Sequence, residues 1–190
     1  MTPEPELREA LLAAVPSLRA FAISLSGQVD RADDLVQDTL LRALSNLHRF
    51  ERGTNLNAWL FTILRNLFHS EYRKRRREVE DPDGSYAGRL KVQPEQGSRL
   101  DFEDFRTALA KLPPDQREAL LLVGASGFSY EEAANICGCA VGTIKSRVNR
   151  ARKRLAELMF LDDADDLSTD NLTAAALQAY GGGLGAGAAV

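Results

Sequence analysis

Residues 128–155 have the sequence FSYEEAANICGCAVGTIKSRVNRARKRL. Ser129 is followed three residues later by Glu132, which predicts a capping box at the start of a helix. Gly138 permits the backbone to reverse at the end of that helix. A second helix follows directly. A helix, a tight turn and a second helix in this order predict a helix-turn-helix.

The second helix of this stretch is strongly basic. Ile144 and Val148 give it an inward apolar stripe at helical spacing. Six cations lie along it with no acidic residue among them: Lys145, Arg147, Arg150, Arg152, Lys153 and Arg154. The small residues Gly142, Thr143 and Ser146 would let this helix approach a surface closely. The pattern favours docking in a DNA major groove with phosphate contacts on either side, and an ordinary αα-hairpin with a basic surface is the alternative.

The charge of the chain is segregated along its length. The 190 residues are 44% hydrophobic, which suits one large or two small domains, and carry a net charge of −3. Cations concentrate at residues 73–77 and 145–154, and carboxylates in the N-terminal region and at residues 162–170. We find no signal peptide and expect no apolar run long enough to span a bilayer, so the expectation is a cytoplasmic protein without membrane contact.

The residues that bind metals or perform catalysis are sparse. Cys137 and Cys139 form a C-x-C pair without further cysteines or a nearby histidine, which is a poor zinc site, so we expect buried structural thiols and no metal or cofactor. His48 and His69 lie apart, with no nucleophile or metal-ligand constellation around either. We therefore expect neither an enzyme nor a small-molecule substrate.

The N-terminal region predicts two successive helices. The first covers Leu7–Leu25, with Pro16 kinking or splitting it and Gly27 ending it. Asp30 to Asp33 offer caps for the second helix, which runs over Asp34–Leu47. Its core side is formed by Val36, Leu40, Ala43 and Leu47. Its opposite stripe is formed by Asp34, Asp38, Leu41 and Ser45. An acidic stripe with an apolar centre suits a protein partner, although an exposed leucine is also common on ordinary surfaces.

A polar loop, FERGTNLN at residues 50–57, precedes a long helix over Ala58–Arg77. Leu60, Ile63, Leu64 and Leu67 should be buried. One polar face is formed by Thr62, Asn66, His69, Arg73 and Arg76 at helical spacing. This face starts beside an aromatic cluster of Trp59, Phe61, Phe68 and Tyr72 and ends in a basic run, which suggests a surface that tracks nucleic acid. The alternative is an aromatic core with a solvated end, and we favour the core role for Trp59 and Phe61.

The C-terminal half predicts a linker and a second helical domain. Residues 78–100 are rich in Asp, Pro, Gly, Ser and Gln and predict a linker. Helices over Asp101–Leu112 and from Pro113 to Val123 lead into the helix-turn-helix. Residues 161–190 are acidic and then rich in Gly and Ala, which predicts a disordered tail. The fold class is therefore all-α, with two small helical domains (7–77 and 101–160) joined by a flexible linker.

Several of these segments together resemble a bacterial protein family. The segments are DRADDLVQDTLLRAL at residues 30–44, NAWLFTILRN at 57–66, and LPPDQREALLLV with FSYEEAA and VGTIKSRVNRAR between residues 112 and 152. They resemble RNA polymerase sigma factors of the extracytoplasmic-function type, over roughly residues 7–160. The stretch from Val123 to Leu155, with VQPEQ in the linker, is especially similar to the EcfG group, which runs the bacterial general stress response.

This resemblance implies a protein that binds core RNA polymerase and directs it to promoter DNA. Residues 7–77 map onto region 2, which binds the polymerase clamp and melts the −10 element, and residues 101–160 onto region 4, which reads the −35 element. The implied core-polymerase contacts are Asp34, Gln37, Asp38, Leu41 and Arg42. The implied −10 contacts are Asn55, Asn57, Thr62, Asn66, His69, Arg73 and Arg76. The implied −35 contacts are Thr143, Lys145, Ser146, Arg147, Asn149, Arg150 and Lys153. The loop at 50–57 matches one that receives a flipped-out base.

The resemblance further implies an anti-sigma factor of the NepR type that wraps both domains and holds the protein inactive. A linker of about twenty residues spans roughly 25 Å, so many domain separations are accessible before a partner selects one. One alternative is a sigma-mimic that sequesters the anti-sigma factor, which would need a receiver domain of about 100 further residues. A simple helix-turn-helix repressor is the other alternative, and it leaves the acidic stripe of 34–45 unexplained.

Overall fold

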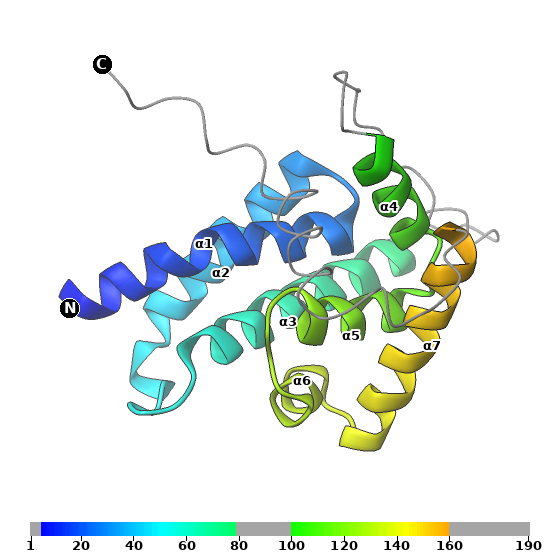
Figure 1. Cartoon of the computed structure of the whole chain (residues 1–190). Helices are drawn as coiled ribbons and strands as arrows, with labels where there is room; N and C mark the ends of the chain where they lie inside the picture. Colours follow the sequence, from blue (N-terminus) through cyan, green and yellow to red (C-terminus); the bar gives the residue numbers. More distant parts are fainter. Residues whose placement is uncertain (1–4, 79–99, 160–190) are drawn as a thin grey trace, which may run out of the picture. The chain divides into compact units, whose positions relative to one another are not determined.

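The computed structural model describes residues 5–78 and 100–159 of the chain, with the side chains of 75–78 and 100–103 excepted. Within these residues every regular element is a helix (Figure 1). They divide into two compact units, residues 5–78 and residues 100–159. The predicted all-α architecture of two small domains is therefore confirmed. The predicted linker and tail fall almost wholly outside the described residues.

The first unit is a bundle of three helices, α1 (Pro5–Ser26), α2 (Val29–Ser45) and α3 (Leu56–Glu78), with a short 3-10 turn at Leu47–Arg49. Each helix packs against the other two, and consecutive helices reverse direction (Figure 1). The core is made of large apolar side chains with almost no exposure, namely Leu18, Phe21, Leu35, Leu60, Phe61 and Leu64. Their removal from water is the main force that holds the three helices together.

Helix α1 is continuous through Pro16. Of the two predicted effects of Pro16, a kink or a split, the split is therefore wrong. A proline removes one backbone hydrogen bond, but Pro16 is on the exposed side, where water can satisfy the carbonyl left without its donor. The buried residues Ala14 and Leu18 flank it and keep the helix on the core. Gly27 follows with a left-handed φ of 70° and ends the helix as predicted.

Among the described helices, α1 is the one whose length and mean hydropathy of 1.3 would suit a membrane span by composition alone. This corrects the expectation that no such run exists. One side of α1 is packed inside the unit, since Leu11, Leu18 and Phe21 are buried. The Phe21 and Phe61 ring centroids lie 5.0 Å apart. The apolar composition of α1 thus serves the helical core.

Helix α2 begins five residues earlier than expected. It starts at Val29 after Gln28, with no side-chain cap, so the caps predicted at residues 30–33 are wrong. Asp33 instead accepts a 2.6 Å hydrogen bond from Nε of Arg19 on α1, and this bond raises the pKa of Arg19 above its ordinary value.

Of the predicted core stripe of α2, Val36 and Ala43 are buried, whereas Leu40 and Leu47 are only half-buried. Leu35 and Thr39 are buried, and the Thr39 hydroxyl donates to the Leu35 carbonyl at 2.6 Å. That internal bond makes a threonine acceptable in the core.

The second unit comprises α4 (Leu100–Ala110), α5 (Pro114–Gly124), α6 (Tyr130–Cys137) and α7 (Val141–Met159). Helix α7 packs against all three others and is the centre of the unit. The apolar stripe predicted for it is buried, since Ile144 is 0% and Val148 2% exposed. Leu109 of α4 and Leu120 of α5 are also buried. Packing against the core therefore buries one side of α7 and determines which side faces outward.

The turn between α6 and α7 has the predicted geometry. The Ser129 hydroxyl accepts from the Glu132 backbone N–H at 3.1 Å, and the Glu132 carboxylate accepts from the Ser129 N–H at 2.9 Å. This is the expected capping box. Gly138 ends α6 with a left-handed φ of 64°. Residues with a Cβ atom rarely adopt this conformation, so glycine secures the tight turn into α7.

Candidate nucleic-acid interface

Core packing leaves one contiguous polar face of α7 turned outward. Its exposed residues are Gly142, Lys145, Asn149, Arg150, Lys153, Arg154 and, in the last turns, the acidic Glu157. Arg154 is paired with Glu157 at 2.8 Å on the same helix. Lys145 lies with its ammonium 5.7 Å from the centroid of the Tyr130 ring at the start of α6. The outward face is thus cationic along most of α7, as a helix that contacts phosphates requires.

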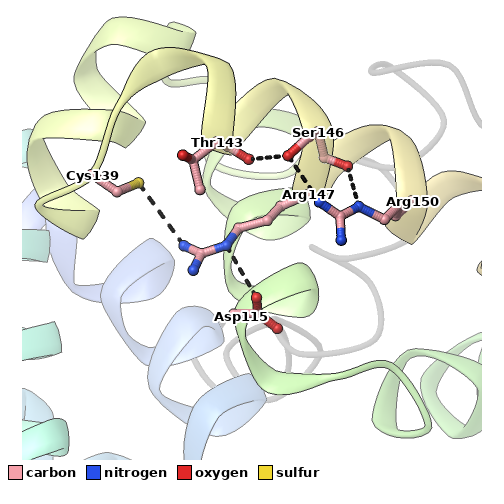
Figure 2. Close-up of polar contacts among 6 residues, drawn as sticks. All are labelled: Asp115, Cys139, Thr143, Ser146, Arg147 and Arg150. Atoms are coloured by element: carbon pink, nitrogen blue, oxygen red, sulfur yellow. Dashed lines mark hydrogen bonds and ion pairs between the residues drawn. The ribbon is translucent and has the colours of Figure 1, made fainter.

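Arg150 is held along this outward face by its own helix. Figure 2 shows its guanidinium bonded to Ser146, with Nη2 donating to the hydroxyl at 3.1 Å and Nε to the backbone carbonyl at 3.3 Å. The Ser146 hydroxyl in turn donates to the Thr143 carbonyl at 2.9 Å. Three predicted −35 residues, Thr143, Ser146 and Arg150, therefore form one connected group. The group orients a guanidinium before any DNA arrives, which lowers the ordering cost of a contact.

Arg147 is directed elsewhere, in contrast to the outward orientation expected from the sequence. Its Nε lies 3.1 Å from the Asp115 carboxylate on α5, and its Nη1 donates to Sγ of Cys139 at 3.9 Å (Figure 2). The side chain is only 24% exposed. The structure thus places Arg147 among the fold contacts of the unit. Its partner is Asp115, a residue that the sequence pattern did not indicate.

The two cysteines differ in their surroundings. Both are free thiols, with Cys137 buried as expected and Cys139 half-buried in the turn beside Arg147. The expectation that both would be buried is therefore wrong for Cys139. Among the described residues no group of three or more His, Cys, Asp or Glu side chains is placed to hold a metal ion.

Gly142 is exposed in the first turn of α7, and the fold does not require a glycine there. A Cβ atom built at this position would meet nothing within 4 Å. Because glycine is unfavourable in a helix and the protein itself leaves room for a side chain, the missing Cβ is best explained by a surface that approaches α7 from outside.

We therefore expect Gly142→Ala to have opposite effects on folding and on DNA binding. The free energy of unfolding should rise by about 0.5–1 kcal/mol, because alanine favours the helix. Affinity for the −35 element should fall several-fold, because the new methyl group keeps the backbone away from the DNA. Chemical denaturation and equilibrium binding measure the two quantities. A variant that binds DNA as well as the original chain would contradict close approach at this position.

The predicted −10 loop in the first unit is a compact turn. Gly53 has a φ of 90°, and the backbone N–H of Thr54 donates to the Glu51 carbonyl at 3.2 Å. The Asn55 side chain accepts from the Ala58 N–H at 3.2 Å and so caps the start of α3. Asn57 is exposed beside it. Asn55 therefore has a structural role in addition to the DNA contact expected of it.

The polar face of α3 is only partly exposed. Asn66 and Arg73 are exposed, whereas Thr62 and His69 are half-buried. The Thr62 hydroxyl donates to the Ala58 carbonyl at 2.8 Å. The His69 ring lies edge-on to the Phe68 ring, with 5.4 Å between centroids. The side chain of Arg76 lies outside the described residues.

Tyr72 is an exposed aromatic at the edge of this face and is not among the predicted DNA contacts. It is 48% exposed and stacks against Phe68 at 6.4 Å. The sequence places Tyr72 in the aromatic cluster but does not predict that its side chain is exposed. An exposed ring fixed by a second ring is suited to stack on an unpaired base. Of the two aromatics favoured for the core, Phe61 is 1% exposed, in agreement with that role, whereas Trp59 is only half-buried.

The acidic stripe predicted on α2 is exposed along its length. All five selected residues are exposed: Asp34, Gln37, Asp38, Leu41 and Arg42. Leu41 is 63% exposed, and Leu44, one turn further on, is 44% exposed. Two large apolar side chains on one exposed helix surface exceed what an isolated surface leucine would explain and are typical of a protein-binding site.

Comparison with known proteins decides the family. Residues 11–78 match the family model of sigma-70 region 2, and residues 102–155 match that of sigma-70 region 4. The chain is 70% identical over 175 residues to the ECF RNA polymerase sigma factor EcfG of Rhodopseudomonas palustris (strain TIE-1), an alignment that covers 92% of this chain and 97% of the relative. The chain belongs to the extracytoplasmic-function sigma factors. The assignment suggested by the sequence is confirmed.

Two further comparisons agree with this membership. The chain is 40% identical over 136 residues to ECF sigma factor SigC of Mycobacterium tuberculosis (strain CDC 1551 / Oshkosh), covering 70% of this chain and 72% of SigC. Its structure is similar to that of the sigma factor RpoE from Bartonella quintana, crystallised with the anti-sigma factor NepR. That similarity has a TM-score of 0.76 and 57% identity over 84% of this chain and 100% of RpoE.

Proposed function

We propose that this sigma factor binds core RNA polymerase through α2 and directs initiation at promoters of the general stress response. One observation carries the proposal: a single chain exposes an acidic surface centred on Leu41 in the part that matches region 2 and a basic face on α7 in the part that matches region 4. We assign region 2 to residues 7–77 and region 4 to 101–160. The protein acts by positioning the polymerase and needs neither a cofactor nor a catalytic group of its own.

The −35 element is assigned to the outward face of α7. Lys145, Arg150 and Lys153 neutralise phosphates, and each such contact adds about one unit to the salt dependence of binding. Asn149 is exposed between them and carries both a donor and an acceptor for base edges. The group of Thr143, Ser146 and Arg150 supplies a guanidinium oriented in advance.

The −10 element is assigned to the loop at 50–57 and the exposed side of α3. Asn66 and Arg73 are exposed on the same side of the helix, with Tyr72 at its edge. The loop lies at the start of α3 and is tied to it by the Asn55 cap and by the Phe50 and Trp59 rings, whose centroids are 5.3 Å apart. A rigid loop beside a polar strip can hold an unstacked base and the strand that follows it.

We expect Asn66→Ala to impair promoter opening more than closed-complex binding. The loss of one hydrogen bond to the separated strand should slow opening about fivefold. A template already unpaired across the −10 element should restore the rate, because the energy of strand separation no longer has to be supplied. Equal defects on duplex and unpaired templates would contradict a role in opening.

We further propose that an anti-sigma factor of the NepR kind inhibits this protein. The support is the 57% identity to a sigma factor crystallised with NepR. The exposed Leu41 and Leu44 surface offers an apolar contact that such an inhibitor and core polymerase would both need. These partners place the protein in the cytoplasm, where polymerase and promoter DNA are found. A sigma-mimic would not need the basic face of α7, and a repressor would not need the exposed surface around Leu41 on α2.

The proposed function is tested by transcription from a promoter library. The chain is added to core polymerase, and run-off transcripts are sequenced to recover the promoters used. We expect a shared motif at both the −10 and −35 positions. Transcripts without a motif, or the same transcripts from core polymerase alone, would contradict the proposal.

A further inference from the structure

Arg147 joins three parts of the second unit through one guanidinium. It extends from α7 to the Asp115 carboxylate in the first turn of α5, at 3.1 Å, and to the thiol of Cys139 in the turn that connects α6 to α7. Figure 2 shows this guanidinium directed away from the one of Arg150, which lies along α7 itself. The two arginines, three residues apart in a run of cations, thus have different surroundings.

The ion pair between Arg147 and Asp115 is better suited to orienting α7 than to stabilising the fold. The Arg147 and Asp115 side chains are 24% and 50% exposed, and ion pairs with such access to water contribute little to folding. Asp115 lies in the first turn of α5, where the helix dipole favours an acidic side chain. Because the ion pair joins α7 to a different helix, it restrains rotation of α7 about its own axis.

Small rotations of α7 would alter its outward face strongly. The ends of helical side chains lie about 5–6 Å from the axis, so a rotation of about 20° moves them by about 2 Å. Hydrogen bonds to a base edge or a phosphate tolerate only a few tenths of an ångström. The apolar stripe of Ile144 and Val148 limits the rotation only by packing, whereas an ion pair at the flank of the helix limits it through a specific polar contact.

We infer that Arg147 is a positioning residue for promoter recognition and not a phosphate contact. Together with Asp115 it holds α7 in the rotational setting that presents Lys145 and Arg150 to the −35 element. The inference rests on the proposed −35 role of α7. It assigns a function to Asp115, which lies outside the recognition helix.

Direct contact and positioning make opposite predictions for Asp115. If Arg147 contacted a phosphate, Asp115 would compete with the DNA for it, and Asp115→Asn would strengthen binding. If Arg147 positions α7, the same change removes its anchor and weakens binding. The salt dependence also differs, because only a phosphate contact releases counterions.

The test measures the binding of promoter DNA by the full chain with core polymerase over a range of salt concentrations. The variants are Arg147→Met, which keeps an unbranched apolar stem, Asp115→Asn and their combination. Each single change should weaken binding about fivefold, and the combination no more than either, because both remove the same contact. The salt slope should not change. The matched control, Arg150→Met, should lower the slope by about one unit.

The charge-swapped pair Arg147→Asp with Asp115→Arg adds a second criterion. The swapped pair should bind promoter DNA more tightly than the chain with Arg147→Asp alone or Asp115→Arg alone, because only the pair re-forms the contact between α7 and α5. The loss of a phosphate contact by itself would not produce this recovery. A slope reduced by about one unit in Arg147→Met, or tighter binding by Asp115→Asn, would overturn the inference while leaving the proposed function intact. If the unmodified chain showed no preference for promoter over random DNA, the proposed function and the inference would both fail.

Discussion

Leu41→Glu should weaken binding to core RNA polymerase about a hundredfold, the loss typical of a central interface residue. Leu41 is 63% exposed at the middle of a surface that also carries Asp34 and Asp38. A glutamate there would have to lose water without a partner when the complex forms, and it would add a like charge beside two carboxylates. Because the side chain points away from the core, the fold should be unaffected.

The measurement is a fluorescence titration of the variant against core polymerase, with circular dichroism as the folding control. Val29→Glu is the matched control, since it places the same charge on an exposed apolar position of α2, about 18 Å from Leu41 along the helix. It should bind normally. Normal binding of core polymerase by Leu41→Glu would contradict the assignment of α2 to the polymerase interface.

The same substitution tests inhibition. Leu41→Glu should also weaken a NepR-like anti-sigma factor, and the two partners should compete for the unmodified chain. A complex that contains the chain, core polymerase and the inhibitor together would contradict a shared surface.

The combined change Lys145→Ala with Arg150→Ala should reduce −35 binding by about a hundredfold or more at moderate salt. Both side chains are exposed on the outward face of α7, and each is expected to neutralise one phosphate. The slope of log affinity against log salt should therefore fall by about two units. Neither residue belongs to the apolar core, so thermal unfolding should be nearly unchanged.

Lys111→Ala is the control for this pair. Lys111 is exposed in the turn after α4 and carries the same charge away from α7. If its loss changed the slope as much as the loss of Lys145 does, binding would depend on the general charge of the unit and not on the face of α7.

The local features of the second unit could be predicted because short patterns determine them. The capping box of Ser129 and Glu132 depends on a spacing of three residues, and the turn at Gly138 depends on a conformation that few other residues adopt. The buried side of α7 follows from the periodicity of Ile144 and Val148. These signals lie within one or two helical turns.

The features that were missed depend on contacts between helices. A flexible side chain such as Arg147 can reach either DNA or a neighbouring helix, and only the position of Asp115 on α5 decides which. The buried side of α2 includes Leu35 and Thr39, which the predicted stripe did not, and the Thr39 hydroxyl finds its partner in its own helix. The exposure of Tyr72 likewise depends on how α3 lies against its neighbours. Sequence periodicity does not contain that information.

Run-off transcription by core polymerase on one library-selected promoter, in its intact form and with a scrambled −35 element, tests whether this chain is a promoter-specificity factor. With the unmodified chain we expect a transcript from the intact promoter, a strong reduction when the −35 element is scrambled, and no transcript without the chain. The chain carrying Lys145→Ala and Arg150→Ala should transcribe both templates equally poorly. A transcript that is independent of the chain, or equal transcription from both templates by the unmodified chain, would contradict the account.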